Sequence, residues 1–267
     1  MRIYLHIGPE EASAARIQSV LSDKRDQLLG KGVLFARSPG NKNHTRLFMA
    51  ATDPAHVDTL RFNRGYITAE KQAVLRASVS SDLAREVEQH KPDTLILACS
   101  QLGNSLRTPS ELETLLAMLR ALSDDIRIIA HVDLPVRMLA RAYEAQILEG
   151  SGLSLQAELD LVGSKNWWQD ALDSAPEIDP AAGAFAETQS PNYWLDLPAL
   201  VSFWEGTFGA GNVHLHGYDA ERFGTPEVTE DIARAFDIKD SFGKAEAVVD
   251  PAPMSQAALT RGRRSRC

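Results

Sequence analysis

Two continuous apolar runs constrain the fold of this chain more than any other feature of its sequence. Residues 94–100 read TLILACS, and residues 124–132 read DDIRIIAHV. Strands that are apolar on both sides of the pleat are typical of parallel sheets with both faces covered. These runs therefore predict two buried parallel strands that helices cover on both faces.

The other segments alternate between strand and helix patterns. Further strands are predicted at residues 2–7, 32–36 and 211–219. Apolar residues at helical spacing predict helices at 12–30, 45–60, 68–90, 110–122, 134–150, 192–208 and 226–236. This alternation indicates right-handed βαβ units, so the expected fold class is α/β: a three-layer, mostly parallel sheet with helices on both faces. Ligands bind such sheets at the carboxyl ends of the strands.

Local signals predict where individual elements begin and end. Ser110 is expected to cap the helix 110–122, because Glu113 follows it at the spacing of a capping box. Gly150 is expected to end the helix 134–150. The α/β domain is expected to span residues 1–243. Residues 244–267 are rich in Ala and Pro and end in TRGRRSRC, which predicts a flexible C-terminal tail.

Composition narrows the classes of function. The 267 residues carry a net charge of −8, which argues against nucleic acid as the partner, since phosphate contacts need clustered cations. The two cysteines, Cys99 and Cys267, make no disulfide framework and favour a reducing compartment. No apolar window is long enough for a membrane span, and the start is unlike a signal peptide. A cytoplasmic location is expected.

The first predicted strand leads into an unusual loop. Residues 6–18 read HIGPEEASAARIQ, and the order strand, tight turn, helix is the layout of a phosphate-binding loop. Where such a loop needs glycine and lysine, this one has Pro9, Glu10 and Glu11. Neither G-x-x-x-x-G-K-[ST] nor G-x-G-x-x-G occurs, so ATP, GTP or NAD binding has no support.

Four segments, taken in order, resemble the bacterial sulfotransferase-like proteins of the P-loop fold. They are LHIGPEEASAARIQ with GKGVLF and NKNH, LILACSQLG, IRIIAHVDLPVRMLARAYEAQILEG, and YWLDLPALVSFWEGTFGAGNVHLHGYDAERF. Together they run from about residue 3 to residue 242 and cover most of the chain. The resemblance implies a transferase that moves a sulfuryl group from 3′-phosphoadenosine 5′-phosphosulfate (PAPS) to a hydroxyl or amine.

The residues that bind PAPS in that family are mostly substituted here. Gly8 is kept, but the resemblance places the family's loop lysine on Glu11, its glycine on Ser13 and its serine on Arg16, with alanines for both threonines. In the third segment, the family's arginine falls on Asp133 and its serine on Arg141. A carboxylate about 4 Å from a phosphate oxygen costs roughly 4 kcal/mol at an effective dielectric near 20.

These substitutions favour a sulfotransferase-like protein that is non-catalytic or accessory and has no cofactor, with a protein partner or a small anionic or glycan ligand. One alternative is an active sulfotransferase that binds PAPS through Arg16 and Arg141, with His44 as its catalytic base. Another is an anion- or glycan-binding module. Arg16 or Arg141 can instead pair with Glu11 or Asp133 and fill the pocket that binds PAPS in the family. His214 and His216 share a strand face, but no third ligand is suggested, so no metal is expected.

Overall fold

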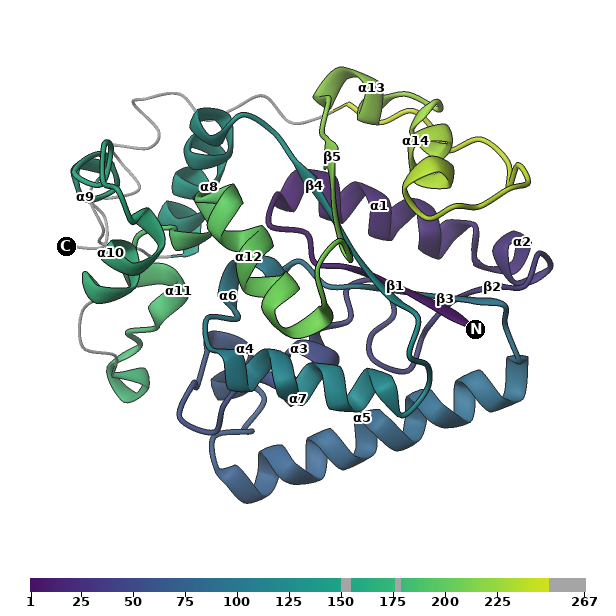
Figure 1. Ribbon diagram of the computed structural model, residues 1–267, viewed down its shortest axis with the longest axis horizontal. Helices are drawn as coiled ribbons and strands as arrows, with labels where there is room; N and C mark the ends of the chain where they lie inside the picture. The colour runs from purple at the N-terminus through teal and green to yellow at the C-terminus, as the bar shows by residue number, and fades with distance from the viewer. Residues whose placement is uncertain (150–154, 176–178, 250–267) are drawn as a thin grey trace.

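The computed structural model describes residues 1–149, 155–175 and 179–249 and places a five-stranded parallel sheet at the centre of the molecule (Figure 1). The strand order is β2-β3-β1-β4-β5, and every neighbouring pair is parallel. The strands are β1 (Arg2–His6), β2 (Val33–Phe35), β3 (Thr94–Ala98), β4 (Ile126–Val132) and β5 (Val213–Gly217). The α/β class is confirmed, and so are the five predicted strands.

Helices cover both faces of the sheet, as expected. Ile3, Leu5 and Ile7 point into the larger of two apolar cores, and Tyr4 points into the other, because side chains alternate along a strand. The larger core is covered by α3 (Thr45–Ala51), α5 (Ala69–His90), α6 (Gln101–Ser105), α7 (Pro109–Arg120), α8 (Pro135–Glu149), α10 (Trp167–Asp173) and α12 (Leu197–Phe208). The smaller core is covered by α1 (Glu11–Asp23), α2 (Arg25–Leu29), α13 (Ala220–Gly224) and α14 (Val228–Ala235).

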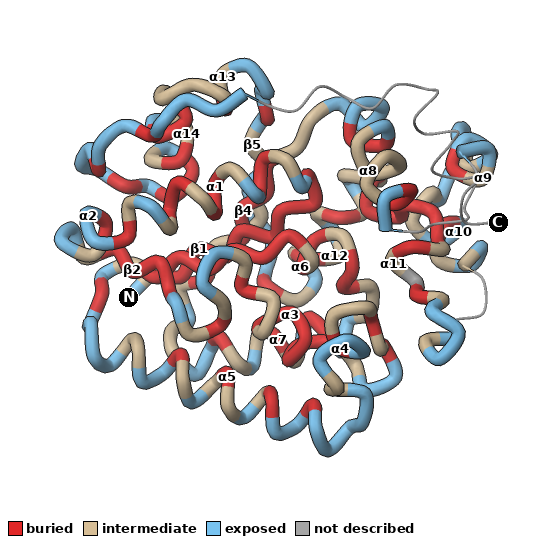
Figure 2. Tube along the Cα trace, turned by 180° about the vertical axis from the view of Figure 1, so that it is seen from behind, coloured by how far each residue is buried: buried red, intermediate tan, exposed pale blue. Residues whose placement is uncertain are grey.

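Short elements complete the described chain at its loops. They are α4 (Thr59–Asn63), α9 (Leu155–Leu159), α11 (Ala186–Gln189) and the 3-10 turns η1 (Pro180–Ala182) and η2 (Tyr193–Leu195). Figure 2 shows that buried residues follow the strands and that exposed residues recur along the outer side of α5. No helix among the described residues is long and apolar enough to cross a membrane.

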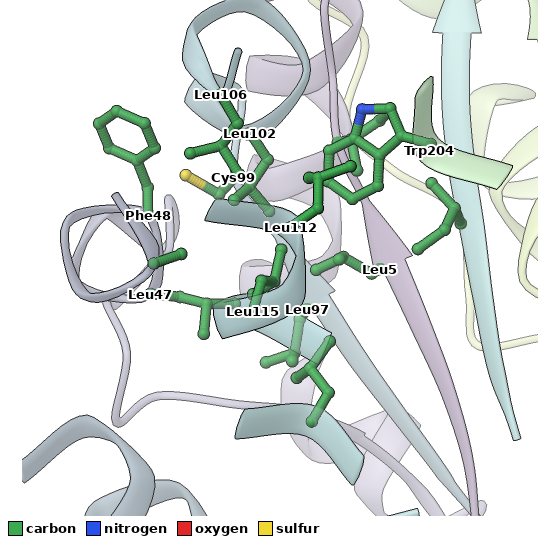
Figure 3. Close-up of a cluster of buried hydrophobic side chains, with 14 of the residues drawn as sticks. Leu5, Leu47, Phe48, Leu97, Cys99, Leu102, Leu106, Leu112, Leu115 and Trp204 are labelled. Atoms are coloured by element: carbon green, nitrogen blue, oxygen red, sulfur yellow. The ribbon is translucent and has the colours of Figure 1, made fainter. Parts of the chain in front are cut away.

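The larger core joins the sheet to α3, α6, α7 and α12. Figure 3 shows Leu5 and Leu97 from the strands facing Leu115 and Leu112 of α7, with the Trp204 indole beside them. Each of these side chains is fully buried. A buried leucine contributes about 1.5–3 kcal/mol relative to exposure, so this core holds the carboxyl ends of the strands in place.

Several helix boundaries differ from the sequence prediction. The helix expected at 12–30 is divided at Lys24 into α1 and α2, and the helix expected at 192–208 begins at Leu197, after η2. The helix expected at 110–122 runs from Pro109 to Arg120, and its capping box is made by Thr108 and Glu111 rather than Ser110 and Glu113. Proline favours the first helical position, so Pro109 sets the start two residues before Ser110 would. The helix expected at 45–60 is two helices, because residues 52–58 form a loop around the buried Arg61 guanidinium.

Part of the expected C-terminal tail is in contact with the domain. Arg16 donates to the Glu246 carbonyl, the Val248 N–H donates to the Gly224 carbonyl, and Ala245 is buried. The chain therefore stays on α1 and α13 beyond residue 243, where the domain was expected to end. The tail prediction for 250–267 and the helix end at Gly150 lie outside the described residues.

Candidate functional site

The loop between β1 and α1 is held tightly at the carboxyl end of the sheet. Gly8 has φ +47°, and a Cβ there would lie 2.8 Å from the Ala14 Cβ and 3.2 Å from the Ser100 Cα. From the other side, the Gly103 N–H of α6 donates to the Ile7 carbonyl at 2.8 Å. The backbone at residues 7–9 therefore passes through a space that admits only glycine at position 8.

We expect Gly8→Ala to lower the free energy of unfolding by about 3 kcal/mol, from a strained φ and steric overlap together. Gly65→Ala is the matched control, because Gly65 also has positive φ (+75°) but nothing lies within 4 Å of its Cβ position. It should lose only about 1 kcal/mol. Urea denaturation of both variants measures the difference. Equal losses would show that the contacts with Ala14 and Ser100 are not restrictive.

Glu10 occupies the N-terminus of α1. It is the N-cap residue, its side chain accepts a hydrogen bond from the Ala12 N–H at 3.0 Å, and it is 2% exposed. The N-terminus of a helix carries partial positive charge and free N–H donors, which makes it a site for anions. In this protein the chain's own Glu10 carboxylate caps the N-terminus of α1.

Arg141 of α8 fixes this carboxylate in place. Its Nε and Nη2 donate to Glu10 Oε2 at 3.0 and 2.6 Å, and Nη2 also donates to Asp133 Oδ2 at 2.8 Å. The guanidinium lies over the Tyr218 ring, 5.4 Å from its centroid. Burial opposes ionisation of Asp133, but the hydrogen bond from Arg141 prevails and lowers the pKa of this carboxyl. The Glu10–Arg141–Asp133 bridge thus joins α1, α8 and the end of β4.

The expected site residues of the loop do not converge on one pocket. Glu11 begins α1 and is exposed; its pKa is raised, first by partial desolvation and then by the Glu10 carboxylate. Ser13 is buried and donates to the Glu10 carbonyl at 2.9 Å. Arg16 faces away, with Nε donating to the Phe223 carbonyl at 3.0 Å. Of the two candidate arginines, only Arg141 therefore lies at the α1 N-terminus, and it is paired with Glu10 and Asp133.

His44 has a structural position. It is fully buried, its Nδ1 accepts from the Ala98 N–H at 3.0 Å, and its Nε2 contacts the Ala36 carbonyl at 2.9 Å. Nδ1 therefore carries no proton and Nε2 is the donor. Burial lowers the pKa of His44 to about 3. Both ring nitrogens are engaged by backbone groups, so the role of His44 as a catalytic base stays a prediction that this geometry does not favour.

Three histidines form a row across the sheet beside this loop. His6 ends β1, and its Nε2 is 3.1 Å from Nδ1 of His131 on β4. The His131 ring stacks on that of His216 of β5, with centroids 5.3 Å apart. His6 and His131 are buried, and burial lowers the pKa of His6 to about 3 and that of His131 to about 2. Imidazoles this close form a neutral, hydrogen-bonded and stacked row, and no group of three or more His, Cys, Asp or Glu side chains among the described residues is arranged to hold a metal ion.

Sequence reasoning missed Glu10 and the histidine row. Glutamate is not among the preferred N-cap residues, so position 10 carries no local capping signal. Its partner Arg141 lies 131 residues away in the chain. His6 and His131 become neighbours only through the register of β1 and β4, in which His6 pairs with Ile129. The available signal was the strand-end position of each histidine.

No protein-family model matches this chain, and no curated protein or solved structure matches it either. The fold defines a parallel α/β protein with helices on both faces of a five-stranded sheet. At the carboxyl ends of its strands it carries a carboxylate–guanidinium bridge over the first helix.

Proposed function

We propose that this chain is a sulfotransferase-like protein that does not bind the nucleotide donor PAPS and works as a non-catalytic or accessory protein. The observation that carries the proposal is Glu10, a buried carboxylate that caps α1 and pairs with Arg141. The α1 N-terminus and the guanidinium are the two features that would attract a phosphate. Both are bound to Glu10.

The electrostatic balance supports this proposal. Glu10 and Asp133 bind the guanidinium of Arg141, and Glu11 places a third carboxylate close enough to Glu10 to raise its own pKa. A phosphate oxygen about 4 Å from one of them meets a repulsion of roughly 4 kcal/mol at an effective dielectric near 20. That alone lowers affinity about a thousandfold. A donor with two phosphate groups would also have to displace Glu10 from its hydrogen bonds.

The active-sulfotransferase alternative has less support. It requires Arg16 and Arg141 to hold charge on PAPS and His44 to take a proton. Arg16 is bound to backbone carbonyls, Arg141 to two carboxylates and His44 to two backbone groups. The anion- or glycan-binding alternative needs the same Arg141 guanidinium and meets the same competition from Glu10.

Calorimetric titration with adenosine 3′,5′-bisphosphate tests the proposal, because this product contains both phosphate groups of the donor. We expect no heat of binding from the wild-type protein. Glu10→Gln removes the internal anion from the α1 N-terminus and leaves Arg141 paired with Asp133 alone, so this variant should bind the nucleotide with a Kd on the order of millimolar. Glu11→Gln is the control. It removes one charge on the same turn but leaves the Glu10–Arg141–Asp133 bridge, so it should give no heat of binding.

Micromolar binding by the wild-type protein would overturn the proposal. Equal binding by the Glu10→Gln and Glu11→Gln variants would show that net charge, rather than occupation of the α1 N-terminus, excludes the nucleotide. Thermal unfolding of each variant confirms that the titrated protein is folded.

A further inference from the structure

A second polar site lies on the other side of α6 from the β1–α1 loop and is independent of it. A cavity of about 30 Å³ is lined by Asn104 and Ser105 of α6, Glu187 of α11, and residues of η2. His56, from the loop between α3 and α4, forms part of its wall. A water molecule needs about 10–15 Å³, so this cavity holds about two water-sized groups.

The His56 imidazole is held in one orientation and one tautomer. Its Nδ1 lies 2.6 Å from Oε1 of Glu111, and the Arg61 guanidinium donates to the His56 carbonyl, also at 2.6 Å. Burial opposes ionisation of Glu111, but the hydrogen bond from His56 and those from backbone N–H groups lower the pKa of this carboxyl. In the neutral tautomer that donates from Nδ1 to Glu111, Nε2, for which the described residues show no partner, is an acceptor.

Other acceptors in the cavity wall also lack partners. Glu187 Oε1 accepts from the Thr59 N–H and hydroxyl at 2.7 and 2.6 Å, but its Oε2 is buried with no partner among the described residues. Ser190 is 9% exposed, and its hydroxyl is likewise buried without a partner there. Buried polar atoms are normally satisfied, so unpartnered atoms in a cavity wall indicate a bound group.

We propose that this cavity binds the end of a small molecule that donates hydrogen bonds, a primary hydroxyl or a primary ammonium. The carboxylate oxygen of Glu187, Nε2 of His56 and the Ser190 hydroxyl are acceptors around one small space. A terminal CH₂–OH or CH₂–NH₃⁺ group matches both the volume and the number of acceptors. The cavity wall also contains the cationic Arg107, so an acceptor-only group such as a carboxylate would meet attraction from Arg107 as well as repulsion from Glu187, and the propionate probe decides between them.

The test uses three probes of matched length on the full chain: n-propanol, n-propylammonium and propionate. The ¹⁵N chemical shift of His56 Nε2 reports occupation directly, and without a probe it should show the Nδ1–H tautomer. We expect saturable shifts with propanol, propylammonium or both, with Kd values on the order of millimolar for such small ligands. Propionate should give no saturable shift.

Two variants connect binding to the wall of the cavity. Glu187→Gln should weaken propylammonium about tenfold and propanol less than about threefold, because a hydrogen bond to a charged group is the stronger one. Ser190→Ala should weaken each probe that binds to the wild-type protein. Ser202→Ala, at an exposed serine of α12, is the control and should change nothing.

The relative affinities of propanol and propylammonium identify the end group of the ligand. It is an amine if propylammonium binds more tightly and an alcohol if propanol does. The proposal is overturned if neither donor gives a saturable shift on folded protein, or if propionate binds as well as they do. Binding that Glu187→Gln and Ser190→Ala both leave unchanged would overturn it as well. None of these outcomes depends on whether the α1 N-terminus binds a nucleotide.

Discussion

Mild acid is expected to unfold this protein, because three buried histidines stay neutral in the folded state. Burial lowers the pKa of His6 and of His44 to about 3 and that of His131 to about 2. In the unfolded chain each titrates near 6.5. Below pH 6.5 the unfolded chain therefore takes up protons that the folded protein does not, and stability falls as pH falls.

The size of this effect follows from the linkage between protonation and folding. Each histidine lowers the free energy of unfolding by about 1.4 kcal/mol per pH unit below 6.5, and the three together by about 4 kcal/mol per pH unit. Asp58 acts in the opposite direction, because burial raises its pKa to about 6 and the folded state binds its proton first. For a domain stable by 5–15 kcal/mol, the histidines prevail within a few pH units.

Urea unfolding at a series of pH values between neutrality and mild acid measures the slope. His131→Asn removes one of the three titrations, so its slope should be about one third smaller than that of the wild-type protein. His90→Asn is the control, because His90 is exposed at the end of α5. If His131→Asn keeps the full slope, the histidine row is not the origin of the acid sensitivity.

Arg141→Met is expected to lower the free energy of unfolding by about 3 kcal/mol, the low end of the loss for a buried ion pair, because the Arg141 side chain is 34% exposed. The variant leaves Glu10, which is 2% exposed, and the Asp133 carboxylate, whose side chain is 9% exposed, without their shared guanidinium. Arg137→Met is the matched control on the same helix, since Arg137 is exposed and its Nη1 is 3.6 Å from Asp133. It should cost less than about 1 kcal/mol.

A double-mutant cycle separates the ion pair from other effects of the methionine. The double variant Glu10→Gln/Arg141→Met should be more stable than the sum of the two single losses predicts. Arg141→Met leaves the Glu10 carboxylate unpaired, and Glu10→Gln removes that charge. Guanidinium chloride would screen the pair, so urea is the denaturant of choice. Strictly additive losses would mean that Glu10 and Arg141 are not coupled.

Apolar continuity allowed the sequence to predict the sheet. Residues 94–98 and 126–132 are strands because runs of branched apolar residues exclude water from both faces, whatever their neighbours are. The long helix α5 was predicted almost to the residue, since its apolar stripe and its Thr68 cap are both local. Local competition explains the shifted start of α7, where Pro109 outweighed the capping pattern at Ser110.

The candidate site was predictable only in part. The loop after β1 was located correctly at the carboxyl end of a central strand, since strand–turn–helix order is written in the local sequence. Which residues of that loop face inward was not predictable, and Glu10 rather than Glu11 proved to be the buried carboxylate. Adjacent residues at the start of a helix point in directions about 100° apart, and the ion pair with Arg141 of α8 decides which of the two faces inward.

The sequence by itself determined the alternation of buried strands and amphipathic helices, because that pattern follows from local hydrophobicity and backbone preference. Only the tertiary structure decided that Arg141 closes on Glu10 and that His6 meets His131, pairs separated by 131 and 125 residues. Such pairs depend on strand order, register and helix placement, and these are determined by many weak contacts acting together. These contacts join residues that are far apart in the chain, so no single stretch of sequence shows them, and the charge balance of the site appears only in the folded chain.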